Sequence, residues 1–183
     1  MESSPPPAEL HGATTDVLNA RALFRVMAEY GVDYLVVGGF AVYAHGYLRG
    51  TADLDIVPRP DLANLSRLGE ALVSVGARVY KTAAPVNVND PHILQRASLV
   101  ALMTDHGRLD VLNVRSTPGL SSDYAALRER AIEVKIDEVA LAVVALDDLI
   151  RMKKAAGRDQ DIEDIRALAA LDEELAEEAS EST

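Results

Sequence analysis

The chain has 183 residues, no cysteine and a formal net charge of −11 at pH 7. This length suffices for one compact domain with a substantial core, and the lack of cysteine excludes disulfide bonds and thiolate metal sites. No apolar run approaches the roughly 20 residues of a membrane-spanning helix, and residues 1–10 lack the basic and apolar segments of a signal peptide, so we expect a cytoplasmic protein.

The first predicted elements are a tail and one helix. Residues 1–13 are rich in serine and proline, which is typical of a mobile, disordered tail. Thr15 or Asp16 can cap a helix that ends at Gly31. The predicted buried face of this helix consists of Val17, Ala20, Phe24 and Met27.

A strand, a glycine turn and a short helix follow. The apolar run 34–37 has the length and composition of a buried strand. Gly38 and Gly39 allow the backbone to turn sharply and to approach a ligand more closely than a Cβ atom would permit. Residues 40–47 fit a short helix.

The next strand, residues 51–57, carries two carboxylates. Strand alternation places Asp53 and Asp55 on one face, about 7 Å apart, and Thr51 on the same face. Two carboxylates on an otherwise apolar strand are costly unless a cation binds them. The pattern therefore favours a divalent metal ion that also takes phosphate oxygens as ligands.

The middle of the chain predicts a helix and a hairpin. Asp61 caps a helix that ends at Gly76 and buries Leu62, Leu65, Leu68 and Leu72. Residues 77–95 indicate only a short strand and a loop. Residues 97–103 and 108–114 fit two strands joined by a turn, and the second carries Asp110. Asp110 is either part of the carboxylate site or an exposed residue of an edge strand.

The last third of the chain is predominantly helical. A helix is predicted over 122–130, a small hairpin over 133–143, and a helix over 149–156 that Asp147 or Asp148 caps and Gly157 ends. Asp159 opens a final helix that buries Ile162, Ile165 and Leu168, and residues 172–183 form a fraying acidic tail. This order of elements predicts an α/β layer architecture.

The stretch G-G-F-A-V-Y-A-H-G-Y-L-R-G-T-A-D-L-D, residues 38–55, resembles the signature of the nucleotidyltransferase superfamily with the DNA polymerase β-like fold. It is most similar to the AbiEii/MenT-type toxin branch, over roughly residues 15–170. The resemblance implies a minimal α/β (α+β) fold: a short mixed sheet flanked by helices over residues 14–145, with a C-terminal helical element over 146–171. It also implies that Asp53, Asp55 and Asp110 are catalytic and hold Mg²⁺, with two ions expected.

Residues 149–164 resemble the C-terminal motif of the same toxin branch, in which a lysine precedes Arg-x-x-Asp. The matching residues are Lys153, Arg158 and Asp161. The resemblance implies that Lys153 is catalytic and binds the nucleotide together with Arg158, and that Asp161 orients them. The alternative is an ordinary charged helical surface. The remaining expected nucleotide-binding residues are Gly38, Gly39, Arg49 and Thr51; for Arg49 the alternative is a surface arginine, and His45 fits a packing role.

The implied activity is transfer of a nucleoside monophosphate from a nucleoside triphosphate such as ATP to an acceptor. The acceptor implied by the resemblance is the 3′ end of tRNA, for a toxin of a toxin–antitoxin pair whose antitoxin partner can switch it off by phosphorylating Thr51. Two alternatives stay open. The first is a small-molecule nucleotidyltransferase of the aminoglycoside type, and the second is a catalytically idle binding module.

Charge bears on the choice between these acceptors. The net charge of −11 favours a cationic small substrate over a nucleic acid. However, residues 146–183 alone carry twelve acids and five bases, a net of −7. The rest of the chain therefore leaves room for a local basic surface formed by Arg49, Arg96, Arg108 and Arg115.

Overall fold

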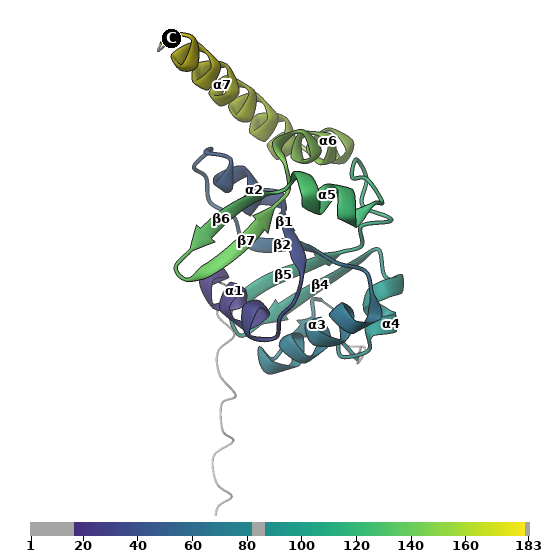
Figure 1. The fold of residues 1–183 in the computed structure, drawn as a ribbon. Coiled ribbons are helices and arrows are strands. Elements are labelled where there is room, and N and C mark those ends of the chain that lie inside the picture. The colour runs from purple at the N-terminus through teal and green to yellow at the C-terminus, as the bar shows by residue number, and fades with distance from the viewer. Residues whose placement is uncertain (1–16, 82–86, 182–183) are drawn as a thin grey trace, which may run out of the picture.

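The computed structural model describes residues 17–81 and 87–181, which form seven helices and seven strands (Figure 1). The helices are α1 (Ala20–Glu29), α2 (Gly38–Ala44), α3 (Leu62–Ser74), α4 (Pro91–Arg96), α5 (Tyr124–Arg130), α6 (Leu146–Ala156) and α7 (Asp159–Glu181). The strands are β1 (Tyr34–Val37), β2 (Asp53–Pro58), β3 (Arg78–Val79), β4 (Leu99–Thr104), β5 (Gly107–Leu112), β6 (Ile132–Ile136) and β7 (Val139–Val143).

All seven strands join one mixed sheet in the order β3-β4-β5-β2-β1-β7-β6. β2 pairs antiparallel with β1 and parallel with β5, and β1 pairs parallel with β7. The expected mixed sheet flanked by helices is thereby confirmed. The strands that carry the three aspartates, β2 and β5, lie side by side in its centre.

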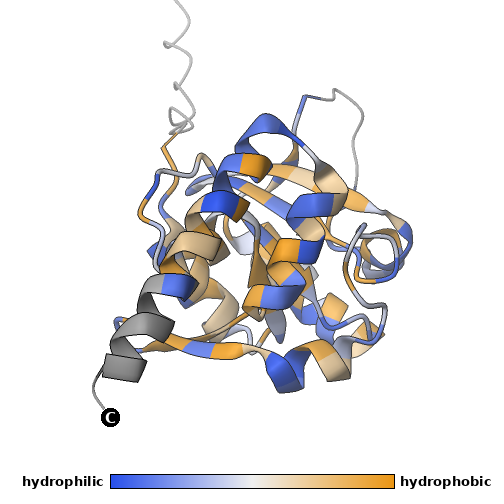
Figure 2. Cartoon of the chain, turned by 90° about the horizontal axis from the view of Figure 1, so that it is seen from above, coloured by the Kyte–Doolittle hydropathy of each residue, from blue (hydrophilic) through white to orange (hydrophobic). Residues whose placement is uncertain are grey.

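The core lies where the central strands meet the helices. Every residue of β1 is buried, and Leu54 and Ile56 of β2 are fully inaccessible to solvent. Leu23, Phe24 and Met27 of α1 join this core, as do Leu65, Leu68 and Leu72 of α3. Along the outer helices, hydrophilic residues interrupt the hydrophobic ones (Figure 2), as one-sided burial requires.

The two C-terminal helices lie together at one end of the molecule, and α7 extends away from the sheet (Figure 1). α6 also packs against α2, the helix that follows β1. The beginning of α7 therefore packs on α6, and the Arg49–Asp164 ion pair ties it to the segment before β2. None of the helices in residues 17–81 and 87–181 combines the length and the apolar character needed to cross a bilayer.

Several predicted boundaries are wrong in the N-terminal half. The short helix begins at Gly38, not at residue 40, so the two glycines form its first residues. β2 begins at Asp53, two residues later than predicted, and Thr51 lies ahead of it with its hydroxyl donating to the Asp53 backbone oxygen. Helix α1 is capped by Asn19, and Val17 is 77% exposed; Thr15 and Asp16 lie outside the described residues, as does the predicted tail 1–13.

Other corrections concern the rest of the chain. Helix α4 was not expected; Asp90 caps it and Pro91 opens it. Asp147 and Asp148 lie inside the first turn of α6, whose N-cap is Ala145. Two residues predicted to be buried are largely exposed, Leu62 at 41% and Ile162 at 42%. The last helix continues to Glu181, through most of the stretch predicted to be an acidic tail.

Candidate active site

Three carboxylates meet on the two central strands. The parallel register pairs Asp55 of β2 directly with Asp110 of β5, and Asp53 lies two residues before Asp55 on the same face of β2. Leu54 and Ile56 point to the opposite face and are fully buried, which fixes the register of the strand. Asp110 therefore belongs to a central strand, and its alternative interpretation as an edge-strand residue is wrong.

The electrostatics of this cluster favour a bound cation. Burial, followed by the charges of Asp53 and Asp110, raises the pKa of Asp55 to about 6. Burial also raises the pKa of Asp110, with the charge of Asp53 acting in the same direction. Like charges that share a poorly solvated site repel one another, so a positive group between them lowers the free energy of the folded protein.

The two glycines let α2 begin against these carboxylates. Gly38 has a φ of +65°, a conformation that glycine adopts without strain, and a Cβ atom there would overlap the Asp55 carboxylate. A Cβ on Gly39 would lie 2.6 Å from the Thr51 hydroxyl oxygen. The Gly-Gly pair is therefore required by close approach of the backbone to Asp55 and Thr51.

A second, mixed-charge cluster stands across the cleft. Lys153 from α6 is only 4% exposed, and its Nζ lies 2.8 Å from Asp161 Oδ1 and 2.7 Å from Asp164 Oδ2. Arg158 donates from Nε to Asp161 Oδ2 at 2.7 Å, and Arg49 donates from Nε to Asp164 Oδ1 at 2.6 Å. This network joins α6, the start of α7 and the segment before β2.

The charges of this network are strongly coupled. Burial alone would raise the pKa of Asp161, but the hydrogen bonds from Arg158 and Lys153 outweigh it and lower that pKa to about 2. Bonds from Arg49 and Lys153 likewise lower the pKa of Asp164. Both carboxylates stay ionised, and they hold the three cations in place beside the cleft.

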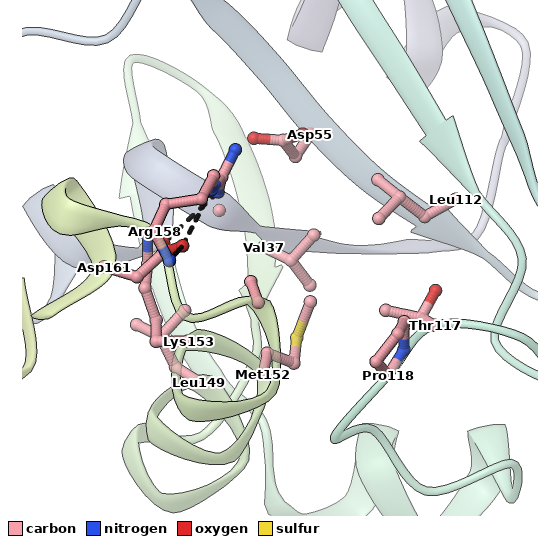
Figure 3. Close-up of a pocket in the computed structure, with 12 residues that line it drawn as sticks. Val37, Asp55, Leu112, Thr117, Pro118, Leu149, Met152, Lys153, Arg158 and Asp161 are labelled. Atoms are coloured by element: carbon pink, nitrogen blue, oxygen red, sulfur yellow. Dashed lines mark hydrogen bonds and ion pairs between the residues drawn. The ribbon is translucent and has the colours of Figure 1, made fainter.

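Two hollows meet at this site. A polar cleft of about 380 Å³ is lined by nine predicted site residues, which are Gly38, Gly39, Arg49, Thr51, Asp53, Asp55, Asp110, Lys153 and Arg158. An adjoining, mostly apolar pocket of about 150 Å³ shares Gly38, Asp55, Lys153 and Arg158 with it. In Figure 3 the Lys153, Arg158 and Asp161 side chains stand on one side of this pocket, and Leu112, Thr117 and Pro118 stand on the other.

The structure thus brings every predicted site residue together, although several lie differently from expectation. Thr51 is not on the strand; its hydroxyl donates to the backbone oxygen of Asp53 at 3.0 Å. Lys153 is enclosed by two carboxylates, whereas the Arg158 side chain is 74% exposed. His45 donates from Nε2 to the Val144 carbonyl oxygen at 2.8 Å, in agreement with a packing role.

Two residues of the site were not among the predicted site residues, Asp164 and Arg108, and Arg108 was named only as part of a possible basic surface. Arg108 lies two residues before Asp110, so strand alternation could have placed it on the same face. Asp164 lies three residues after Asp161, on the same face of α7. Their importance comes from partners distant in the sequence, Asp53 for Arg108 and Arg49 for Asp164, which no local pattern reveals.

The carboxylates fit a magnesium site in kind, since Mg²⁺ prefers carboxylate oxygens as its protein ligands. Within residues 17–81 and 87–181, however, no three acidic, histidine or cysteine side chains converge closely enough to form a ready metal site. The guanidinium of Arg108 lies between Asp53 and Asp110 instead.

Comparison with known proteins points to the same family as the sequence resemblance. A family model described as "Nucleotidyltransferase of unknown function (DUF6036)" matches residues 18–176. No curated protein sequence matches the chain.

Solved structures extend the likeness in fold. An antigenic nucleotidyltransferase-like protein from Paracoccidioides brasiliensis has a TM-score of 0.57 at 16% identity, covering 86% of this chain and 78% of that protein. ANT(2")-Ia, solved with adenylyl-2"-tobramycin, has a TM-score of 0.53 at 13% identity, covering 82% and 86%. The lincosamide antibiotic adenylyltransferase LnuA, bound to lincomycin, has a TM-score of 0.52 at 14% identity, covering 84% and 97%.

Proposed function

The chain belongs to the nucleotidyltransferases of unknown function, and we propose that it moves a nucleoside monophosphate from a nucleoside triphosphate to an acceptor hydroxyl, with release of pyrophosphate. The observation that carries this proposal is the pairing of Asp55 with Asp110, beside Asp53. Across the polar cleft from these carboxylates lies a cationic wall formed by Arg49, Lys153 and Arg158. Carboxylates on one side and cations on the other suit a substrate that arrives with both phosphate groups and a metal ion.

In this proposal Asp53, Asp55 and Asp110 would hold Mg²⁺, with two ions expected. The metal would supply positive charge to the reacting phosphate oxygens and would acidify the acceptor hydroxyl. Arg158, whose guanidinium is mostly exposed, would bind phosphate directly. Lys153 and Arg49 would add positive charge to the same side of the cleft without direct contact with the phosphates, while Asp161 and Asp164 orient them. Gly38 and Gly39 would let the triphosphate approach the backbone.

The apolar pocket is a suitable place for the nucleobase. Leu112, Pro118 and Met152 present aliphatic surface there, and Lys153 and Arg158 join it to the phosphate side of the cleft. A flat base would cover apolar surface in this pocket while its phosphates face the cations. ATP is the nucleotide we propose to test first.

For the acceptor, we propose the 3′ end of tRNA, with the protein acting in the cytoplasm as the toxin of a toxin–antitoxin pair. The support is the resemblance of residues 38–55 and 149–164 to the AbiEii/MenT-type motifs. The second candidate is a small cationic acceptor. It is favoured by the net charge of −11 and by the fold likeness to proteins solved with adenylyl-2"-tobramycin and with lincomycin. Retention of all three aspartates argues against an idle binding module.

One assay tests the activity and separates the acceptors. The purified protein with Mg²⁺ is incubated with each α-labelled nucleoside triphosphate, together with total tRNA, tobramycin, lincomycin or no acceptor. We expect labelled tRNA and no labelled antibiotic, and no label with the Asp53→Ala or Asp110→Ala variant. Labelled antibiotic would select the second candidate, and no transfer to any acceptor would contradict the tRNA proposal.

We also propose that phosphorylation of Thr51 switches the enzyme off, through a partner antitoxin that acts as a kinase. The Thr51 hydroxyl lies 3.4 Å from Asp53 Oδ1, so a phosphate there would add about two negative charges beside the carboxylates. It would compete with them for metal and repel the incoming triphosphate. Chemically phosphorylated protein should lose transfer but keep its circular-dichroism spectrum, with Thr51→Val as the unmodified control. Transfer at the unmodified rate would contradict the switch.

A further inference from the structure

Arg108 spans the gap between the two strands that carry the aspartates. The parallel register of β2 and β5 places it opposite Asp53, two residues before Asp110 on its own strand. Its Nη2 lies 3.3 Å from Asp53 Oδ2 and 3.2 Å from Asp110 Oδ2. One guanidinium nitrogen therefore contacts a carboxylate on each strand.

The rest of this guanidinium is held less completely. Its Cζ lies 4.8 Å from the centre of the Tyr80 ring, a cation–π distance. Its Nε is buried and has no hydrogen-bond partner in the described part of the chain. A buried N–H without a partner is costly, so the attraction of the carboxylates must offset that cost. The position of Arg108 thus depends on the negative charge of the aspartates.

A divalent ion and this guanidinium compete for the same oxygens. An ion bound by Asp53 and Asp110 would face the positive charge of Arg108 at contact distance in a partly buried site, where charges are poorly screened. The described residues hold no ready group of three metal ligands, and Arg108 contacts two of the three aspartates. The cleft into which Arg108 opens gives the side chain space to move away, because Arg108 is one of its lining residues.

We propose that Arg108 is the resident cation of the metal-free site and that a divalent ion binds only by displacing it. Arg108 is accordingly a positioning residue: it bridges Asp53 and Asp110 before the substrate arrives, at the expense of metal affinity. This inference rests on the proposed function, since it takes the aspartates to be metal ligands. Its consequence is that free metal binds weakly and that metal bound to the triphosphate enters with its own phosphate ligands.

The test is a titration of the nucleotide-free protein with Mn²⁺. Electron paramagnetic resonance measures the concentration of the unbound ion, and therefore the affinity. Arg108→Gln should bind Mn²⁺ about tenfold more tightly than the wild type, because the competing charge is lost. The same variant should melt at a lower temperature in chelator and gain more from Mn²⁺ than the wild type does. Arg108→Lys keeps the charge but loses the planar guanidinium that stacks on Tyr80, so its Mn²⁺ affinity should lie between those of the wild type and Arg108→Gln.

Two controls make the outcomes distinct. Arg21→Gln removes the same charge from an exposed ion pair with Asp137, far along the chain, and should leave Mn²⁺ affinity unchanged. Asp55→Asn added to Arg108→Gln should abolish the gain. If the wild type and Arg108→Gln bind Mn²⁺ with equal affinity, and this binding is lost with Asp55→Asn, displacement of Arg108 is overturned. The assignment of the aspartates as metal ligands then stands. Equal tightening in Arg108→Lys and Arg108→Gln also overturns it. Absence of any Asp55-dependent binding overturns both.

Discussion

Among single residues, Asp55 has the most strained electrostatic position in the site. Its carboxyl is raised in pKa by burial and by two neighbouring aspartates, while the nearest cations, Lys153 and Arg158, only partly oppose this. The group therefore destabilises the metal-free fold at neutral pH. A carboxyl with a perturbed pKa in a cleft is a candidate ligand-binding group, which agrees with the metal-binding role proposed above.

We predict that Asp55→Asn abolishes nucleotide transfer yet stabilises the protein in chelator at pH 8, by about 2 kcal/mol. The folded pKa of about 6 lies above the unfolded value of about 3.9, so stability falls as the pH rises from about 4 to 6. The variant lacks this titration. Its advantage, measured by urea unfolding, should be absent at pH 4 and complete above pH 6.

The exposed carboxylate of Glu70 on α3 provides the matched control. Glu70→Gln should leave the pH dependence of unfolding unchanged. An Asp55→Asn variant that is less stable than the wild type at pH 8 would show that the carboxylate supports the fold.

At the scale of elements, the junction of β1 and α2 sets how closely the helix approaches β2. Gly38 and Gly157 both have positive φ, but only Gly38 faces a crowded neighbour; a Cβ on Gly157 would come no closer than 3.8 Å to the Lys154 carbonyl oxygen. Comparing the two positions therefore separates two reasons for a glycine: the positive φ, which both share, and the lack of space for a Cβ atom, which applies only to Gly38.

Gly38→Ala should therefore destabilise the fold more than Gly157→Ala. The Gly157 substitution carries only the left-handed backbone penalty, about 1 kcal/mol, while the Gly38 substitution also displaces the Asp55 carboxylate and should cost about 3 kcal/mol or more. Thermal unfolding of the two variants provides the comparison. Similar losses in both would mean that Asp55 moves aside freely.

Elements with strong local signals could be predicted from the sequence, and elements set by tertiary contacts could not. The alternation in Asp53-Leu54-Asp55-Ile56 and the hairpin turn before Asp110 gave strands β2, β4 and β5, and Gly157 marked the end of α6. The start of α2 was missed because two glycines are poor helix formers, and only the approach to Asp55 explains them there. Helix α4 is six residues long and follows a loop sequence, so no helical period was visible.

The same division holds for the site. Asp53, Asp55 and Asp110 followed from strand pattern and from the family resemblance. Lys153 was expected to bind the nucleotide with Asp161 orienting it; it lines the cleft, and its Nζ lies between Asp161 and Asp164, the second of which was not predicted. That enclosure depends on the angle between α6 and α7, which the sequence does not specify.

For the whole molecule, the buried ion pairs of Lys153 join the two C-terminal helices, and Arg49 ties Asp164 of α7 to the segment before β2. Asp161 and Asp164 are 1% and 0% exposed, and loss of their shared partner would leave each buried carboxylate with a single cation, Arg158 for Asp161 and Arg49 for Asp164. We predict that Lys153→Ala costs about 3 kcal/mol or more in unfolding free energy, whereas the neighbouring Lys154→Ala costs less than about 0.5 kcal/mol. Lys154 is exposed on the same helix, which makes it the matched control.

Urea unfolding at pH 7 measures both values. A Lys153→Ala variant as stable as Lys154→Ala, but with weaker nucleotide binding, would restore the direct phosphate contact that the sequence suggested.

The Arg49–Asp164 contact also has a consequence for protein synthesis. The two residues are 115 positions apart, so Arg49, the glycine pair and Asp53 leave the ribosome long before their partner exists. Contacts so distant in sequence form late in folding. A nascent chain that already contains Asp53, Asp55 and Asp110 still lacks Asp161 and Asp164, the carboxylates that hold the cationic wall in place. The arrangement proposed for catalysis is therefore incomplete during translation until residue 164 has emerged.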